Sequence, residues 1–204
     1  MTDARSSGAR ELRPQGRRTR KRLLDAATVV LSDTGFHATR VDDIVRRART
    51  SHGTFYLYFA NKEDLLRALA VECAHEMDAL AVGLGAVPRD ARGAAELRRF
   101  FDGFLTTYGR YGPVIRAWME GHVADRDATA LGVRAFTDIA SALANRLDEA
   151  GAPADRATIS ALMAMLERSA YFLVSRQLEV DADELLDSLT TLVHRGFFGA
   201  SVAA

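Results

Sequence analysis

Acidic and imidazole side chains that could perform catalysis occur in this chain, but their spacing matches no known site. Glu120, His122, Asp125 and Asp127 lie close together and could form a metal site or an acid–base set, with a solvated loop as the alternative. The His-Glu pair at 75–76 lacks the second histidine of a zinc-protease helix, and no nucleophile elbow or phosphate-cradling glycine loop is present. We therefore expect a protein that is not an enzyme and uses no metal or cofactor.

The single cysteine and the apolar stretches exclude further classes. Cys73 excludes an intrachain disulfide and a multi-thiolate metal site within one chain, and its place in an apolar helical stripe predicts core packing. The longest uncharged stretches, 79–88 and 157–166, are shorter than the roughly 18 to 20 residues that a spanning helix requires. The N-terminus also lacks the apolar block of a secretory signal. We therefore expect no membrane segment and a cytoplasmic protein.

Charge is divided unequally along the chain, although the formal net charge is zero. Residues 1–59 carry 12 Arg or Lys against 6 Asp or Glu, whereas residues 60–204 carry 15 against 21. A dense basic run at 10–22, interrupted by Pro14 and Gly16, favours an anionic polymer as partner. A solvated tail is the alternative for such a run taken alone. We expect residues 1–17 to form a disordered basic arm.

Hydroxyl, imidazole and ammonium groups gather in a short segment between residues 51 and 62. Their types suit hydrogen bonds to phosphates and base edges, and a glycine among them would let a backbone come close. The lysine stands at the expected start of a helix, where its ammonium and the free backbone N–H groups could hold one phosphate together. The residues are Ser51, His52, Gly53, Thr54, Tyr56, Tyr58 and Lys62.

Two helices are expected ahead of this segment. Apolar residues recur at helical spacing over 23–31, and Gly35 is placed to end that helix. Thr39 and Asp42 have capping-box spacing, which predicts a second, shorter helix that ends at about residue 48.

A third, compact helix follows after a turn of about three residues. Ser51 can cap this helix, and Phe55 and Phe59 share its buried face. Two short helices joined in this way form a helix-turn-helix, which braces one helix across a phosphate backbone while the next reaches base edges in the major groove.

The remainder of the chain is expected to be helical as well. Asn61 and Asp64 open a long helix, and glycines and prolines separate the later ones. No period-two alternation indicates a strand. We predict an all-α fold of about nine helices, with a helix-turn-helix domain at 18–63 and a helical bundle at 64–204. The later helices are expected near 91–111, 114–123, 127–150, 155–177 and 182–198.

The segment from Thr39 to Ala48, followed by residues 51–66 (SHGTFYLYFANKEDLL), resembles the signature of TetR-family transcriptional regulators. The resemblance is specific over about residues 18–70 and continues beyond them only in length and helical layout. The family's usual glycine in the turn is replaced by Arg49, which adds a charge close to where a phosphate would lie.

The resemblance implies three groups of DNA contacts. One group would hold the phosphate backbone, and a second would face the major groove, where Leu57 could touch a thymine methyl. A basic group would extend contact outside the major groove, toward the neighbouring minor groove. For Tyr58, core packing is an equal alternative. The backbone group is Thr39, Ser51, Tyr56, Tyr58 and Lys62, the groove group is His52, Gly53, Thr54 and Leu57, the basic group is Arg17, Arg18 and Arg20, and Arg40 and Arg49 complete the set.

The resemblance also implies a homodimer whose seam is built by the last two helices. One helix-turn-helix reads only a few base pairs, so selective binding requires a two-fold dimer on a palindromic site. Packing within a single chain is the alternative use of the same apolar residues. The predicted dimer residues are Met163, Leu166, Leu173, Val174, Leu185, Leu189, Leu192, Val193 and Phe197.

A pocket for a small apolar or amphipathic effector is the third implication, and the layout looks especially like actinobacterial members of the family. Plain core packing is the alternative for any single residue of the pocket. The predicted lining is Phe101, Phe104, Tyr108, Trp118, Met119, His122, Met163, Leu166, Glu167 and Tyr171.

These expectations together describe a dimeric, ligand-responsive regulator, a repressor that binds double-stranded operator DNA and is released by its effector. Two other classes remain open from the sequence. A non-specific architectural protein would coat DNA uniformly, and a DNA-modifying enzyme would require clustered carboxylates for a metal, which the sequence does not offer.

Overall fold

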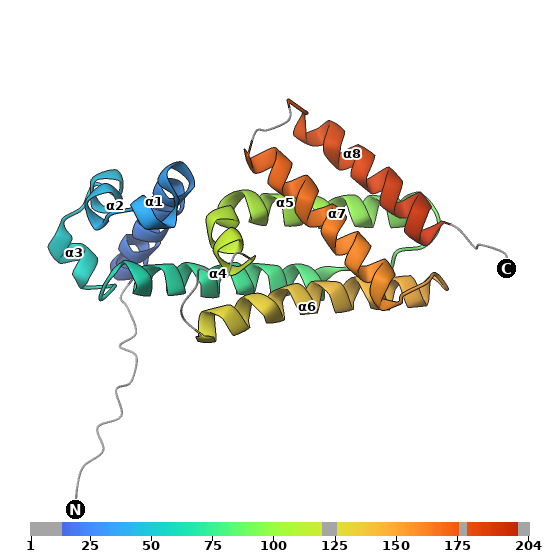
Figure 1. The fold of residues 1–204 in the computed structure, drawn as a ribbon, viewed down its shortest axis with the longest axis horizontal. Helices are drawn as coiled ribbons and strands as arrows, with labels where there is room; N and C mark the ends of the chain where they lie inside the picture. The colour runs from blue at the N-terminus through green and yellow to red at the C-terminus, as the bar shows by residue number, and fades with distance from the viewer. Residues whose placement is uncertain (1–13, 120–125, 176–178, 200–204) are drawn as a thin grey trace, which may run out of the picture. The chain divides into compact units, whose positions relative to one another are not determined.

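The computed structural model describes residues 14–119, 126–175 and 179–199 of the chain. These residues form eight α-helices and a final π-helical turn, and no β-strand occurs among them (Figure 1). The predicted all-α class is therefore confirmed. In chain order the elements are α1 (Pro14–Ala38), α2 (Val41–Arg47), α3 (His52–Tyr56), α4 (Lys62–Gly83), α5 (Ala91–Met119), α6 (Arg126–Glu149), α7 (Arg156–Ser175), α8 (Ala182–Val193) and η1 (His194–Phe198).

The chain divides into two compact units, Met1–Leu65 and Leu66–Ala204. In the first unit, α2 packs against both α1 and α3. Its core is formed by side chains from all three helices that are almost completely shielded from solvent. They include Leu23, Leu31, Ile44, Phe55 and Phe59. The predicted burial of the two phenylalanines is confirmed.

Helix α1 differs from its prediction at its start and agrees at its end. It begins at Pro14, so Arg17 lies on a helix rather than in the disordered arm expected over 1–17. Proline suits the first helical position, because its φ is preset and its missing N–H would have no intrahelical partner there. At the other end, Gly35 adopts a left-handed φ of 74° and interrupts the helix, as predicted.

The second unit is built around α5, which contacts α6, α7, α8 and η1. Its buried face is unusually aromatic, with Phe100, Phe101, Phe104, Tyr108 and Tyr111 all at most 1% exposed. This row fixes α5 as the central helix of the unit.

The predicted break in α5 at Gly112 and Pro113 is wrong, because one helix runs through both residues. Proline removes a single backbone donor, a loss of about 3 kcal/mol in a helix interior. Tyr111, Val114 and Ile115 on either side are fully buried, and each such side chain contributes roughly 1.5 to 3 kcal/mol. Packing therefore keeps the helix continuous, while its last turns bend away from its first part (Figure 1).

Candidate nucleic-acid interface

Helix α3 is held in place by a buried aromatic residue and by a side-chain cap at its N-terminus. The Ser51 hydroxyl accepts a hydrogen bond from the Thr54 backbone N–H at 3.1 Å, so the predicted N-cap is confirmed. Phe55 is completely buried, and its ring meets that of Tyr56 edge-on at 5.3 Å. With this face of the helix fixed, Tyr56 and Leu57 remain 57% and 79% exposed. Large apolar side chains this open on a small helical unit indicate a contact surface.

The turn before α3 contains a residue with a left-handed backbone, a conformation that glycine usually supplies, but the residue here is an arginine. Arg49 has a φ of 50° and is the only non-glycine residue with positive φ in the described part of the chain. Its N–H donates to Arg46 O at 3.2 Å, and Thr50 N–H donates to Val45 O at 3.0 Å. These two bonds form the Schellman ending of α2. The exposed Arg49 side chain therefore sits on a strained residue at the bend.

Thr39 does not occupy the position predicted for it. It is 2% exposed, and its hydroxyl donates to Gly35 O at 2.7 Å and lies 2.9 Å from the Thr34 hydroxyl. The N-cap of α2 is Arg40, without a side-chain cap, so the capping box predicted from Thr39 is wrong. Because Gly35 has a left-handed φ and interrupts α1, its carbonyl oxygen is available to accept the hydrogen bond from the Thr39 hydroxyl. Thr39 thus supports the bend between α1 and α2 and presents no free hydroxyl to a phosphate.

The first turn of α4 is closed by two side chains. Asn61 Oδ1 accepts from Asp64 N–H at 2.8 Å, and Asp64 Oδ2 accepts from Ala60 N–H at 3.0 Å. The predicted opening of this helix is confirmed. Lys62 is half-buried, and its Nζ donates to Thr39 O at 3.1 Å, which ties the start of α4 to the α1–α2 bend. The predicted contact of Lys62 with a phosphate stays a prediction. It requires the same ammonium to bind the Thr39 carbonyl oxygen and the phosphate at the same time.

His52 has a protein partner that the sequence did not indicate. Its Nε2 lies 2.5 Å from Asp42 Oδ1, although both side chains are more than half exposed. The contact joins α2 to α3 across the turn. Ten residues separate the two, so no local pattern could show that Asp42 faces His52.

Gly53 is not required by the fold. A Cβ placed on it would meet only the Ser51 hydroxyl, at 3.8 Å, and its φ is not positive. The fold therefore leaves room at Gly53 for the close backbone approach predicted for it, which stays a prediction.

The basic residues of the first unit differ in how free they are. Arg17, Arg18 and Arg40 are exposed. Arg20 is half-buried, with its guanidinium 5.5 Å from the centre of the Phe59 ring. The Tyr58 side chain is partly exposed, which fits either of its predicted roles.

In the second unit, the predicted effector residues come together on α5 and α7, which pack against each other. Phe101, Phe104, Tyr108 and Leu166 are fully buried. The Tyr108 hydroxyl donates to Glu167 Oε1 at 2.9 Å, and burial together with this carboxylate raises the pKa of Tyr108 well above its usual range. Met163 and Tyr171 are half-buried. The side chains of Trp118, Met119 and His122 lie outside the described residues.

A second polar link on α5 was not predicted. The Tyr111 hydroxyl donates to Glu76 Oε1 at 2.9 Å, and Arg110 Nη1 donates to the same oxygen at 3.0 Å. Burial and Glu76 raise the pKa of Tyr111 as well. Because Glu76 is on α4 and Glu167 on α7, two tyrosines three residues apart join α5 to two different helices.

Three of the predicted dimer residues are core residues of the chain. Leu166, Leu189 and Val193 are at most 3% exposed in the single chain, which favours for them the core packing that was the alternative to a seam. Helical spacing could not tell the inward face from the outward one. Leu192, by contrast, is 62% exposed. The others, which are Met163, Leu173, Val174, Leu185 and Phe197, are half-buried.

Helix α7 carries more apolar surface than its own chain covers. Only 17% of its most apolar 18-residue stretch is buried. By length and composition it is also the one described helix that could cross a membrane, contrary to the estimate from uncharged stretches. Glu167 and Arg168 interrupt the apolar sequence of this helix, and Leu162, Leu166 and Ala170 pack inward.

Carboxylates and imidazoles do not gather into a metal site in the part of the chain that the structure describes. Asp127 lies in the first turn of α6. Its predicted neighbours Glu120, His122 and Asp125 are outside the described residues.

Comparison with known proteins agrees with this geometry. Residues 23–69 match the family described as bacterial regulatory proteins, tetR family. Over 50 residues the chain is 44% identical to the fatty acid metabolism regulator protein of Bacillus subtilis (strain 168). That match covers 24% of this chain and 26% of the relative, so the chain spans about a quarter of the curated relative's length.

Solved structures extend the likeness over most of the chain. A TetR-like transcriptional regulator from Rhodococcus sp. RHA1 has a TM-score of 0.63 at 26% identity and covers 87% of this chain and 94% of its own. FadR from Bacillus subtilis, in complex with stearoyl-CoA, has a TM-score of 0.61 at 18% identity, with coverage of 86% and 98%. The second likeness concerns the fold alone.

An all-α chain with a capped helix behind a helix-turn-helix bend, together with these relatives, defines the class of DNA-binding transcription regulators. Residues 23–69 match the TetR family, and most of the chain has the fold of a solved TetR-like transcriptional regulator.

Proposed function

We propose that this protein is a ligand-responsive repressor that acts in the cytoplasm as a homodimer on a palindromic operator. The observation that carries this proposal is the outward face of α3. Phe55 fixes the helix in the core, while Gly53, Tyr56 and Leu57 stand open to a partner. A helix held in this way can enter a major groove without losing its own packing.

Electrostatics supports duplex DNA as the partner of this face. Residues 1–59 carry twice as many basic as acidic side chains, and Arg17, Arg18 and Arg40 are exposed. Such groups attract phosphates and release counterions when they bind, so affinity falls with salt. Arg49 adds a further exposed guanidinium at the bend that precedes α3.

A two-fold dimer is supported by the uncovered apolar surface of α7 and by the exposed Leu192 on α8. An apolar face that a chain leaves open is most simply covered by a second copy of the same chain. Met163, Leu173 and Val174 are the α7 residues that we assign to this seam. Their half-buried state leaves part of each side chain available.

We assign an apolar or amphipathic effector to the second unit. The aromatic row of α5 makes the interior of this unit apolar, and the Tyr108–Glu167 pair places a polar group inside it. The relatives support this chemistry, because one is a fatty acid metabolism regulator and another was solved with stearoyl-CoA. Coupling between sites of about 1 to 3 kcal/mol would change operator affinity roughly 5- to 150-fold.

Selection from a random duplex library followed by footprinting tests the proposal. The purified protein is expected to enrich one palindrome and to protect two half-sites about one helical turn apart or a multiple of it. A long-chain acyl-CoA is then titrated into the complex and is expected to release the DNA. Uniform coating of every duplex would favour an architectural protein, and strand cleavage would favour an enzyme; either result contradicts the proposal.

A further inference from the structure

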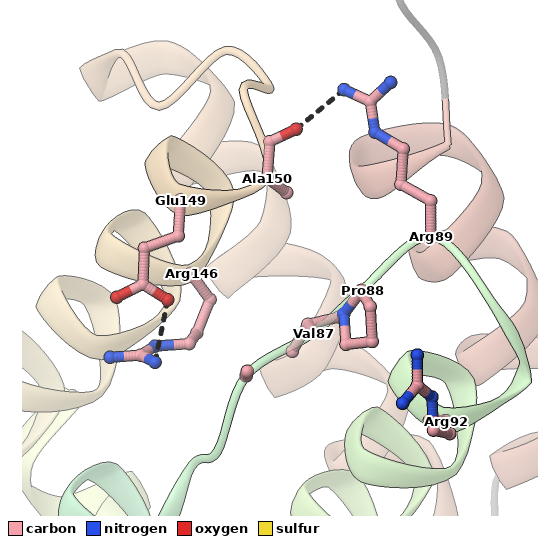
Figure 2. A pocket seen from close by; sticks show the side chains of 8 residues that line it. Val87, Pro88, Arg89, Arg92, Arg146, Glu149 and Ala150 are labelled. Atoms are coloured by element: carbon pink, nitrogen blue, oxygen red, sulfur yellow. Dashed lines mark hydrogen bonds and ion pairs between the residues drawn. The ribbon is translucent and has the colours of Figure 1, made fainter.

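A hollow in the second unit lies apart from the predicted effector residues. It has a volume of about 580 Å³, within the range of small-molecule sites. The segment between α4 and α5 forms one wall and the C-terminal end of α6 forms the other (Figure 2). None of the predicted effector residues lines it. The lining is Ala86, Val87, Pro88, Arg89, Arg92, Arg146, Glu149 and Ala150.

The charge of this lining is strongly biased. The lining includes three arginines, Arg89, Arg92 and Arg146, and one carboxylate, Glu149. Arg92 is 84% exposed and is already paired with Asp90 through its Nε and Nη2, so Arg89 and Arg146 are the guanidinium groups that can receive a ligand. Residues 60–204 as a whole are acidic, so the hollow reverses the charge of its surroundings. Guanidinium groups bind carboxylates and phosphates through paired N–H donors, which makes an oxyanion the natural partner.

Arg146 carries a donor without an acceptor. Its Nη1 lies 2.8 Å from Glu149 Oε2, as the dashed line in Figure 2 shows. Its Nε is buried and has no hydrogen-bond partner among the described residues. The guanidinium of Arg146 therefore keeps hydrogen-bonding capacity that the described residues of the chain do not use.

The wall opposite Arg146 is held in place before any ligand arrives. Arg89 donates to Ala150 O at 2.7 Å, and His194 Nε2 lies 2.9 Å from Pro88 O. A Cβ on Gly93 would come within 1.8 Å of Pro88 O, so only glycine allows α5 to pack this closely on the segment. Because these three contacts already fix the segment, it requires little ordering when a ligand binds.

We propose that this hollow binds an organic oxyanion, a carboxylate or phosphate group carried on an apolar body. Arg146 and Arg89 receive the oxyanion, and Ala86, Val87 and Pro88 cover the apolar part. Glu149 acts as an internal anion that occupies Arg146 until the ligand replaces it. The site goes beyond the proposed function, because it differs from the effector pocket assigned to α5 and α7.

Calorimetric titration of the full-length protein at constant ionic strength tests the proposal, with phenyl phosphate, benzoate and the neutral phenol as probes. At least one of the two anions is expected to bind with one site per chain, and phenol is not. Comparison of the two anions identifies the preferred head group. Equal binding of phenol, or no binding of either anion, would overturn the proposal.

Two variants with opposite expected effects exclude a general loss of folding. Arg146→Gln is expected to weaken anion binding by about tenfold or more, because a charge-assisted pair is lost. Glu149→Gln removes the competing carboxylate and is expected to tighten binding by about threefold or more. The matched control is Arg134→Gln, also on α6, whose guanidinium is 79% exposed and pairs with Asp138. If the control weakens binding as much as Arg146→Gln, or if Glu149→Gln fails to tighten it, the assigned site is wrong.

Discussion

At the scale of single residues, the proposed contact face consists of residues that have no evident role in stabilising the fold. Phe55 and Ser51 have structural tasks, one in the core and one at the helix start. Gly53 and Leu57 have none: the glycine is free of steric demand and the leucine is 79% exposed. Residues that weaken a helix or expose apolar surface without benefit to the fold are accounted for by a partner.

Gly53→Ala separates stability from DNA binding. Alanine is the better helix former, so the free energy of unfolding is expected to rise by about 0.5 to 1 kcal/mol. The added methyl group stands where the duplex must approach, and operator affinity is expected to fall about tenfold or more. Chemical denaturation and a gel-shift titration measure the two effects.

Gly109→Ala on α5 is the matched control for this variant. A Cβ there would meet nothing within 4 Å, so a similar gain in stability is expected without any change in DNA affinity. Unchanged operator binding by Gly53→Ala would remove this residue from the interface.

At the scale of elements, the turn between α2 and α3 has a left-handed backbone at a position where the sequence has arginine instead of glycine. Arg49 holds a φ of 50° because the two bonds of the Schellman ending and the packing of Ile44 and Val45 fix the backbone around it. The left-handed region disfavours every residue with a Cβ, so the turn stores strain.

Arg49→Gly is expected to relieve that strain and to raise the free energy of unfolding by about 0.5 to 1 kcal/mol. Arg49→Ala removes the same charge but keeps the Cβ, so it is expected to leave stability nearly unchanged. Urea denaturation of the three proteins measures the difference. Equal stabilisation by both substitutions would mean that the charge, rather than the backbone, is responsible.

The two tyrosine links of α5 predict a pH dependence. The folded-state pKa values of Tyr108 and Tyr111 are raised, so the folded chain keeps their protons at pH values where the unfolded chain, with tyrosine pKa values near 10, releases them. This contribution to stability is complete below about pH 10 and is lost as pH rises above it.

Thermal unfolding between about pH 8 and 11 checks this dependence. The double variant Tyr108→Phe, Tyr111→Phe is expected to lose stability at neutral pH and to show a shallower decline above about pH 10. A decline as steep as in the parent protein would contradict the assignment.

Local patterns predicted most of the helices well, and failed where distant parts of the chain decide. Ser51, Gly35 and the Asn61–Asp64 pair act within one turn of themselves, so their spacing was sufficient. Thr39 was misassigned because its partner depends on the left-handed Gly35. The Pro113 break was wrong because buried neighbours on α5 outweigh one lost hydrogen bond. His52–Asp42 and Tyr111–Glu76 pair residues at separations for which a single sequence holds no signal.

At the scale of the whole molecule, two kinds of apolar surface serve different purposes. The inward stripes of α7 and α8 complete the core of one chain, as Leu166, Leu189 and Val193 show. The outward side of α7 and the exposed Leu192 are the surfaces that the proposed dimer would use. In the proposed dimer, two helix-turn-helix domains contact one duplex. Because each domain reads only a few base pairs, selective binding requires both of them.

Leu192→Glu is expected to weaken the dimer about a hundredfold, because a two-fold seam loses the same apolar contact twice and gains two facing charges. Sedimentation equilibrium measures the change. Val133→Glu on α6 is the control, since Val133 is similarly exposed, at 64%, but lies outside the proposed seam. A dimer that tolerates Leu192→Glu as well as Val133→Glu would place the interface elsewhere.

Competition binding of the selected duplex against unrelated DNA, repeated at several salt concentrations, tests the central claim most directly. The account predicts a preference of about a thousandfold or more for the selected duplex, together with affinity that falls as salt rises. It also predicts that Gly53→Ala reduces this preference. Equal affinity for both duplexes at every salt concentration, by a correctly folded protein, would contradict the claim that the outward face of α3 reads DNA.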